Sequence, residues 1–270
     1  LLGATAGRTT LNGEGLQHQD GHSLVLASTV PSCEAYDPAF AYELAVIIRD
    51  GIHRMYPDGD ATEGADVFYY LTLYNENLPM PARPEGVENG ILEGMYRFAA
   101  APEGTTHPAT VLFSGSAQGA ARAAQAELAE HYDVGADLWS VTSYKRLRED
   151  AIAVDRWNRL HPGEEFRVPL VTRRLAEGEG PVVAVTDFMR MVADQVSRWS
   201  PRPWGSLGTD GYGRSDTRET LRRFFETDAA HVVVAVLAEL AAAGTVGADV
   251  VADAIARYGI DPDAAPPWTR

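Results

Sequence analysis

The chain has 270 residues, of which 45% are hydrophobic and 23% charged, a composition typical of a globular protein with enough apolar material for a core. Its 38 acidic and 23 basic residues give a formal net charge of −15, which repels phosphate backbones and anionic lipids and so argues against nucleic-acid and membrane binding. Cys33 is the only cysteine, which excludes an internal disulfide and a cysteine-based metal site and suits a cytoplasmic protein. No apolar run approaches the roughly 18 residues of a membrane span.

The chain opens on Leu1-Leu-Gly-Ala, without an initiating Met or the basic segment of a signal peptide, so we expect that a longer protein has lost its front. The first predicted elements are a loop over 1–22, a strand over 24–29, a helix over 37–56 and a strand over 67–73. Asp37 is expected to cap the helix, with Pro38 at its first position. The order strand, helix, strand predicts a parallel sheet.

Pro79, Pro81 and Pro84 interrupt both helix and sheet, which predicts a linker over residues 79–85 between one domain at 1–78 and a second at 86–270. The second block alternates strands and helices and is therefore predicted to be another α/β unit. Its predicted strands are 110–113, 137–142, 181–186 and 204–207, and its predicted helices are 117–131, 146–160, 188–199, 217–225, 229–243 and 248–258.

The segment from Gly13 to His22 is the richest in chemistry, because it holds two histidines and a carboxylate among glycines. Residues His18 and His22 could share a metal only on a helix, and the glycines argue against a helix here. The second alternative is an active-site loop in which an imidazole exchanges protons near neutral pH. The third is a surface turn whose histidines have no function.

Two other loops could have a function, but each also has a simpler structural explanation. Residues 114–119, Ser-Gly-Ser-Ala-Gln-Gly, lie between a strand and a helix as a phosphate cradle would, but lack the P-loop lysine, which favours a tight turn. Residues 210–216 could bind a cation through two carboxylates. We favour a loop in which Ser215 or Asp216 caps the helix expected from Thr217.

The segment from Arg8 to His22 resembles, almost residue for residue, part of the homodimeric-type pyruvate dehydrogenases, the decarboxylating first component of the pyruvate dehydrogenase complex. The resemblance covers essentially the whole chain. It continues in residues 36–43, 72–77, 80–86, 140–143, 156–158, 207–216 and 250–256.

This resemblance implies an α/β fold of the transketolase-like thiamine diphosphate enzymes. Residues 1–78 would be the end of the pyrimidine-binding domain, and residues 86–270 the transketolase C-terminal-like domain. The implied activity is oxidative decarboxylation of pyruvate, with thiamine diphosphate and Mg²⁺ as cofactors and transfer of the acetyl group to the lipoyl domain of the dihydrolipoyl acetyltransferase. A homodimer is also implied. The alternatives are another 2-oxo acid dehydrogenase or transketolase-type enzyme, or a non-catalytic dimerisation module.

By position, the resemblance makes His18 a catalytic residue near the substrate, with His22 as a second candidate on the same loop. Glu14 and Asp20 are expected to set the tautomer or charge of these histidines. The family holds its cofactor through a Gly-Asp-Gly segment followed by an Asn, and no such pair occurs here. We therefore expect no cofactor-binding or metal-binding residue in this chain, and no pyruvate decarboxylation by the chain alone.

Overall fold

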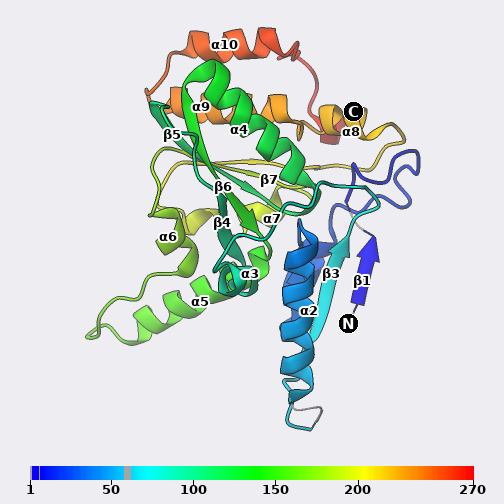
Figure 1. Cartoon of the computed structure of the whole chain (residues 1–270), viewed down its shortest axis with the longest axis vertical. Helices are drawn as coiled ribbons and strands as arrows, with labels where there is room; N and C mark the ends of the chain where they lie inside the picture. Colours follow the sequence, from blue (N-terminus) through cyan, green and yellow to red (C-terminus); the bar gives the residue numbers. More distant parts are fainter. Residues whose placement is uncertain (1, 6, 58–61) are drawn as a thin grey trace.

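Two β-sheets with flanking helices form the frame of the protein in the computed structural model, which describes residues 2–5, 7–57 and 62–270 (Figure 1). The smaller sheet has three parallel strands in the order β1-β3-β2, and the larger has five in the order β4-β6-β5-β7-β8. The elements of the smaller sheet are β1 (Leu2–Thr5), α1 (Ser23–Ser28), β2 (Cys33–Tyr36), α2 (Ala41–Met55) and β3 (Phe68–Leu73).

The predicted strand, helix and strand form a parallel unit, but its first strand is β2 rather than residues 24–29. Residues 24–28 belong to α1, and the predicted loop over 1–22 contains β1, so both predictions were wrong there. A short apolar run fits a strand and a buried helix equally well. The first N–H groups of a helix have no partner within the helix. The carboxylate of Asp20 favours the helix here, because it accepts hydrogen bonds from the backbone N–H groups of His22 at 2.9 Å and Ser23 at 3.0 Å.

Strand β2 escaped prediction because Glu34 places a charge inside a run of four residues. Burial of that charge requires partners. The carboxylate of Glu34 accepts hydrogen bonds from Arg54 at 2.9 Å and from Arg146 at 3.4 Å. Two arginines from distant parts of the chain therefore allow a charged residue in the strand.

Helix α2 begins at Ala41, three residues after the predicted start at Pro38. Glu43 provides the cap in place of Asp37, since its carboxylate accepts the N–H groups of Ala39 at 2.6 Å and Phe40 at 3.2 Å. The prediction that Asp37 caps this helix was wrong, because its buried carboxylate accepts hydrogen bonds from the hydroxyls of Thr72, Tyr74 and Ser114 instead.

The larger sheet consists of β4 (Met95–Ala99), β5 (His107–Phe113), β6 (Val134–Val141), β7 (Val182–Val185) and β8 (Trp204–Leu207). Its strands are parallel except β4, which runs antiparallel to β6. Every residue of β7 is buried, as expected of a parallel strand covered on both faces.

Helices cover both faces of this sheet, with α4, α9 and α10 on one side and α5 and α6 on the other (Figure 1). No helix in the described ranges is long and apolar enough to span a membrane. The helices are α3 (Glu88–Glu93), α4 (Gln118–Tyr132), α5 (Tyr144–Leu160), α6 (Leu170–Leu175), α7 (Met191–Asp194), α8 (Arg218–Phe224), α9 (Ala229–Ala242) and α10 (Ala248–Arg257).

Most elements of the second block were predicted within a few residues, but α3, β4 and α6 were missed and the helix over 188–199 is broken. Its residues form only the short α7 and a 3₁₀ turn at Ser197–Trp199. Helix α8 is capped by Thr217, whose hydroxyl accepts the N–H of Thr220 at 3.3 Å. The prediction that Ser215 or Asp216 is the cap was therefore wrong by one or two residues.

Asp37 joins the two sheets where their strands end. Its carboxylate accepts hydrogen bonds from the hydroxyls of Thr72 at 2.5 Å, Ser114 at 2.6 Å and Tyr74. Thr72 and Tyr74 belong to the smaller sheet and its exit, whereas Ser114 follows β5. The Ser-Gly-Ser turn therefore anchors one sheet to the other. Residues 79–85, the predicted linker, lie in a segment without helix or strand.

Candidate active site

The loop after β1 carries both candidate histidines, and His18 stands at its exposed tip. The side chain of His18 is 63% exposed, and its Nε2 lies 3.8 Å from a carboxylate oxygen of Glu14. The carboxylate of Glu14 thus places a negative charge beside the ring. An exposed imidazole with one acidic neighbour is suited to exchanging a proton with a bound molecule.

His22 lies on the same loop in different surroundings. Its Nδ1 is 3.1 Å from Nη2 of Arg8, and its Nε2 is 3.4 Å from the same nitrogen. Arg8 is almost completely buried, with 1% exposure. Asp20 was expected to act on the histidine rings, but its carboxylate is engaged by the N–H groups of His22 and Ser23 and by the Ser23 hydroxyl.

The histidine loop packs against residues 210–216, the loop for which the sequence suggested a cation site. The side chain of Gln19 donates to the carbonyl of Arg214 at 2.7 Å and accepts the N–H of Arg214 at 2.8 Å. The N–H of Gly13 donates to the carbonyl of Asp216 at 3.1 Å. The two loops therefore form one wall, although about 200 residues separate them in the sequence.

Glycine allows this close packing. A Cβ atom on Gly15 would lie 2.6 Å from the hydroxyl of Ser215, and one on Gly213 would lie 2.7 Å from the side-chain oxygen of Gln19. Both separations are shorter than real Cβ contacts. The glycines of the histidine loop argue against a helix and permit close approach, but the sequence does not show which segment approaches them. The structure shows that it is the loop that contains Gly213 and Ser215.

Two arginines of α8 hold the base of the histidine loop. Arg218 donates to the carbonyl of Thr10 at 3.0 Å, and Arg222 donates to the hydroxyl of Thr9 at 3.3 Å. Arg222 also donates to Glu76 at 3.2 Å, on the segment that follows β3. Helix α8 therefore links the loop to the segment that follows β3 of the smaller sheet.

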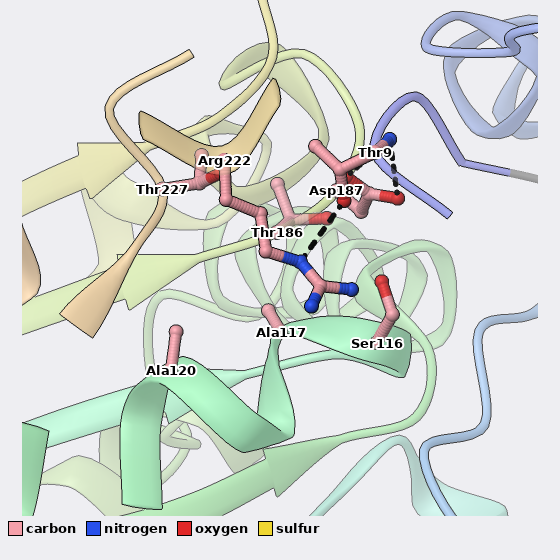
Figure 2. Close-up of a pocket in the computed structure, with 8 residues that line it drawn as sticks. All are labelled: Thr9, Ser116, Ala117, Ala120, Thr186, Asp187, Arg222 and Thr227. Atoms are coloured by element: carbon pink, nitrogen blue, oxygen red, sulfur yellow. Dashed lines mark hydrogen bonds between the residues drawn. The ribbon is translucent and has the colours of Figure 1, made fainter. Parts of the chain in front are cut away.

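Asp187 holds the other side of the same loop. Each of its carboxylate oxygens lies 3.2 Å from the backbone nitrogen of Thr9 (Figure 2). Burial is the main cause that raises the pKa of Asp187 to about 6, against the lowering effect of its hydrogen bond and of Arg222.

A cavity of about 10 Å³ adjoins Asp187, which is the space of about one water molecule. Figure 2 shows its lining: Thr9, Ser116, Ala117, Ala120, Thr186, Asp187, Arg222 and Thr227. It is too small for a substrate, so this region supports the loop rather than binding a reactant.

Among the described residues, no group of three His, Cys, Asp or Glu side chains could hold a metal ion. In particular, His18 and His22 have different partners, Glu14 and Arg8, and do not share a site. The carboxylates of residues 210–216 are also used otherwise, since Asp210 pairs with Arg190 at 2.9 Å.

Comparison with known families agrees with this architecture. Residues 1–81 match the middle domain of the pyruvate dehydrogenase E1 component, and residues 94–228 match the transketolase-like C-terminal domain. The chain belongs to the transketolase-like family. The resemblance and the fold class expected from the sequence are thereby confirmed.

Individual relatives of this transketolase-like chain share about half of its residues. The pyruvate dehydrogenase E1 components of Pseudomonas aeruginosa and Escherichia coli are each 50% identical over 264 residues, which is 97% of this chain and 29% of the relative. The same component of Mycolicibacterium smegmatis is 51% identical over 262 residues, 97% of this chain and 28% of the relative. The chain thus spans less than a third of the length of these relatives.

Solved structures resemble the chain in fold. The transketolase of Leishmania mexicana has a TM-score of 0.59 at 16% identity, covering 88% of this chain and 29% of that one. The transketolase of Campylobacter jejuni has a TM-score of 0.59 at 16% identity, covering 88% of this chain and 30% of that one.

Proposed function

We propose that this chain is part of a pyruvate dehydrogenase E1 component that decarboxylates pyruvate oxidatively and transfers the acetyl group to the lipoyl domain of the dihydrolipoyl acetyltransferase. The observation that carries the proposal is 50% identity over 97% of the chain to proteins of that name. The proposal includes a homodimer in the cytoplasm.

The two families that match this chain are thiamine diphosphate enzymes, so the proposal includes that cofactor together with Mg²⁺. The sequence lacks the Gly-Asp-Gly segment followed by an Asn that the resemblance implies for a magnesium–diphosphate site. We therefore assign the cofactor to other parts of a longer E1 protein and derive no chemical step through it here.

In this proposal the chain supplies a substrate-facing wall, with His18 and His22 as catalytic residues. A neutral His18 can accept a proton and a charged His18 can hold an anionic oxygen, and the carboxylate of Glu14 lies 3.8 Å from its Nε2. The paired loops support this role, because general acid–base catalysis depends on a firmly placed side chain.

The experiment that tests the proposal replaces the matching 264 residues of the Escherichia coli E1 component with this chain. We expect the purified chimera to reduce a dye in the presence of pyruvate and to acetylate a lipoyl domain. The 270-residue chain by itself serves as the control and is expected to be inactive.

A folded chimera that uses a ketose phosphate but not pyruvate would contradict the proposal in favour of a transketolase-type enzyme. A folded chimera without either activity would favour a non-catalytic module. Circular dichroism and gel filtration establish that the chimera is folded before its activity is interpreted.

A further inference from the structure

Tyr144 has a buried hydroxyl group for which the described residues provide no hydrogen-bond partner. Tyr144 is the first residue of α5 and is 4% exposed. A buried donor without a partner costs free energy, so such groups in native proteins normally bond to a protein atom or to an ordered water molecule. The hydroxyl of Tyr144 therefore indicates a bound molecule that supplies the missing partner.

A second polar group without a partner adjoins the same cavity. The side-chain oxygen of Gln195, the residue that follows α7, is buried and accepts no hydrogen bond from the described ranges. The amide nitrogen of Gln195 donates to the carbonyl of Val192 at 3.1 Å, and this bond fixes which end of the amide is the oxygen. Tyr144 and Gln195 both line a cavity of about 10 Å³. A donor and an acceptor that do not bond to each other thus share one small space.

Asp37 lines the same cavity, and its carboxylate can accept a further hydrogen bond. A carboxylate offers about four acceptor positions. Three of those of Asp37 are used by the hydroxyls of Thr72, Tyr74 and Ser114. Burial is the main cause that raises the pKa of Tyr144, and the carboxylates of Asp37 and Asp194 raise it further. The hydroxyl of Tyr144 therefore lies within electrostatic reach of Asp37 and of the residue before Gln195.

The properties of the cavity define the class of molecule that it can hold. Its volume corresponds to about one water molecule. Because its pKa is raised, the hydroxyl of Tyr144 keeps its proton and acts as a donor, not as a phenolate ligand of a metal ion. The carboxylate of Asp37 disfavours an anion. A small neutral molecule that both accepts and donates hydrogen bonds meets all these conditions.

We propose that one water molecule is bound between Tyr144, Gln195 and Asp37. It accepts a hydrogen bond from the hydroxyl of Tyr144 and donates one to the side-chain oxygen of Gln195. Its second proton is directed to the carboxylate of Asp37. The water thereby connects the start of α5 and the end of α7 to the group that joins the two sheets. This site belongs to the architecture of the chain and does not depend on the proposed function.

The bound water is measured by ¹⁷O magnetic relaxation dispersion, which counts the water molecules that stay bound for longer than the protein takes to tumble. Tyr144→Phe removes only the hydroxyl, and Tyr212→Phe does the same at a residue that is 80% exposed. Relative to the unchanged 270-residue chain, Tyr144→Phe should lose one bound water and Tyr212→Phe none. An unchanged count in Tyr144→Phe, or an equal loss in both variants, would overturn the proposal.

Gln195→Met tests whether the two groups hold the same water molecule. It removes the accepting oxygen and keeps a side chain of similar length. Gln195→Met and the double variant with Tyr144→Phe should each lose one water. A Gln195→Met variant that keeps the water, or a double variant that loses two, would reject a single bridging molecule. Only the water count of Gln195→Met is interpreted, because this variant also loses the bond to Val192.

The stability of Tyr144→Phe provides an independent test, because the presence and absence of the water predict effects of opposite sign. Removing a buried hydroxyl that lacks a partner should stabilise the protein. Removing one that donates to a bound water should raise the equilibrium constant of unfolding about fivefold. Urea unfolding at pH 7 measures this constant, and circular dichroism establishes that the variant is folded. A constant equal to that of the wild type, or smaller, would contradict the proposal.

Discussion

Both carboxylate oxygens of Asp187 lie 3.2 Å from the backbone nitrogen of Thr9. The buried side chain of Asp187 therefore supports the loop that carries His18. Asp187 follows β7 at the end of the larger sheet, whereas Thr9 follows β1 of the smaller sheet. The stability of the protein and the placement of its candidate site therefore depend on the same group.

Replacement of Asp187 by Asn should flatten the dependence of stability on pH. The pKa of Asp187 is about 6 in the native protein against 3.8 for an ordinary aspartate, so the native state binds the proton more tightly. This contribution to the free energy of unfolding is fully present below pH 3.8 and is lost as the pH rises through about 6. Its size, from the difference between the two pKa values, is about 3 kcal/mol. Urea unfolding between pH 4 and pH 8 measures the free energy.

The wild type should lose this stability as the pH rises, and Asp187→Asn should lose less. Burial also raises the pKa of Asp37 and Glu43, which act in the same direction in both proteins. The difference between the two curves therefore isolates Asp187. Parallel curves would contradict the assignment.

Gly115 and Gly119 form a matched pair of sites for Ala. Gly115 has a φ of +50°, and a Cβ there would collide with the Tyr74 hydroxyl and lie 2.6 Å from Asp37. Gly115→Ala should reduce the free energy of unfolding by about 3 kcal/mol. Gly119 lies in α4 with no atom within 4 Å of the added Cβ, and Gly119→Ala should raise it by about 0.5–1 kcal/mol. Similar effects at both sites would disprove the specific role of the Ser-Gly-Ser turn.

In the chimera, His18→Ala should lower turnover with pyruvate by about a hundredfold, the lower range for a lost acid–base group. Stability should hardly change, because the side chain is 63% exposed. Glu14→Gln should have a smaller effect in the same direction, since it removes only the partner. His53→Ala, an exposed histidine on α2, is the matched control. Wild-type turnover of His18→Ala would reject its catalytic role.

Cys33 should be inert in the folded protein. Its side chain is 2% exposed, and burial is the main cause that raises the pKa of its thiol, so little thiolate is available for reaction. Alkylation of Cys33 by iodoacetamide at pH 8, followed by mass spectrometry, should be at least about a hundredfold slower than alkylation of glutathione. In urea, which unfolds the protein, the alkylation of Cys33 should go to completion. Rapid labelling without urea would show that β2 is not protected as described.

The sequence predicted elements whose signal is local. The Val-rich β7 and the long helices α4, α5 and α9 have periodic or continuous apolar patterns, and they lie within a few residues of their predicted positions. Strand β2 has no such pattern, because Glu34 becomes acceptable only when Arg54 and Arg146 reach it.

The same distinction applies to the candidate site. Its histidine loop could be recognised from the residues themselves, but its support could not. Arg8 donates a hydrogen bond to the carbonyl of Gly211, and Gln19 donates one to the carbonyl of Arg214. About 200 residues separate the partners of each bond in the sequence. No spacing rule links positions so far apart, so only folding shows that these two loops form one wall.

These long separations also set an order of events during synthesis. The bond from Arg222 to Thr9 spans 213 residues, which a ribosome adds in roughly ten to forty seconds. During that interval Thr9 and Arg8 have left the ribosome while α8 does not yet exist. The wall that carries His18 and His22 is therefore among the last parts of the chain to assemble. A ribosome that stalls before residue 210 leaves a nascent chain that has both histidines and Asp187 but lacks residues 210–216 and α8, which hold the other side of the histidine loop.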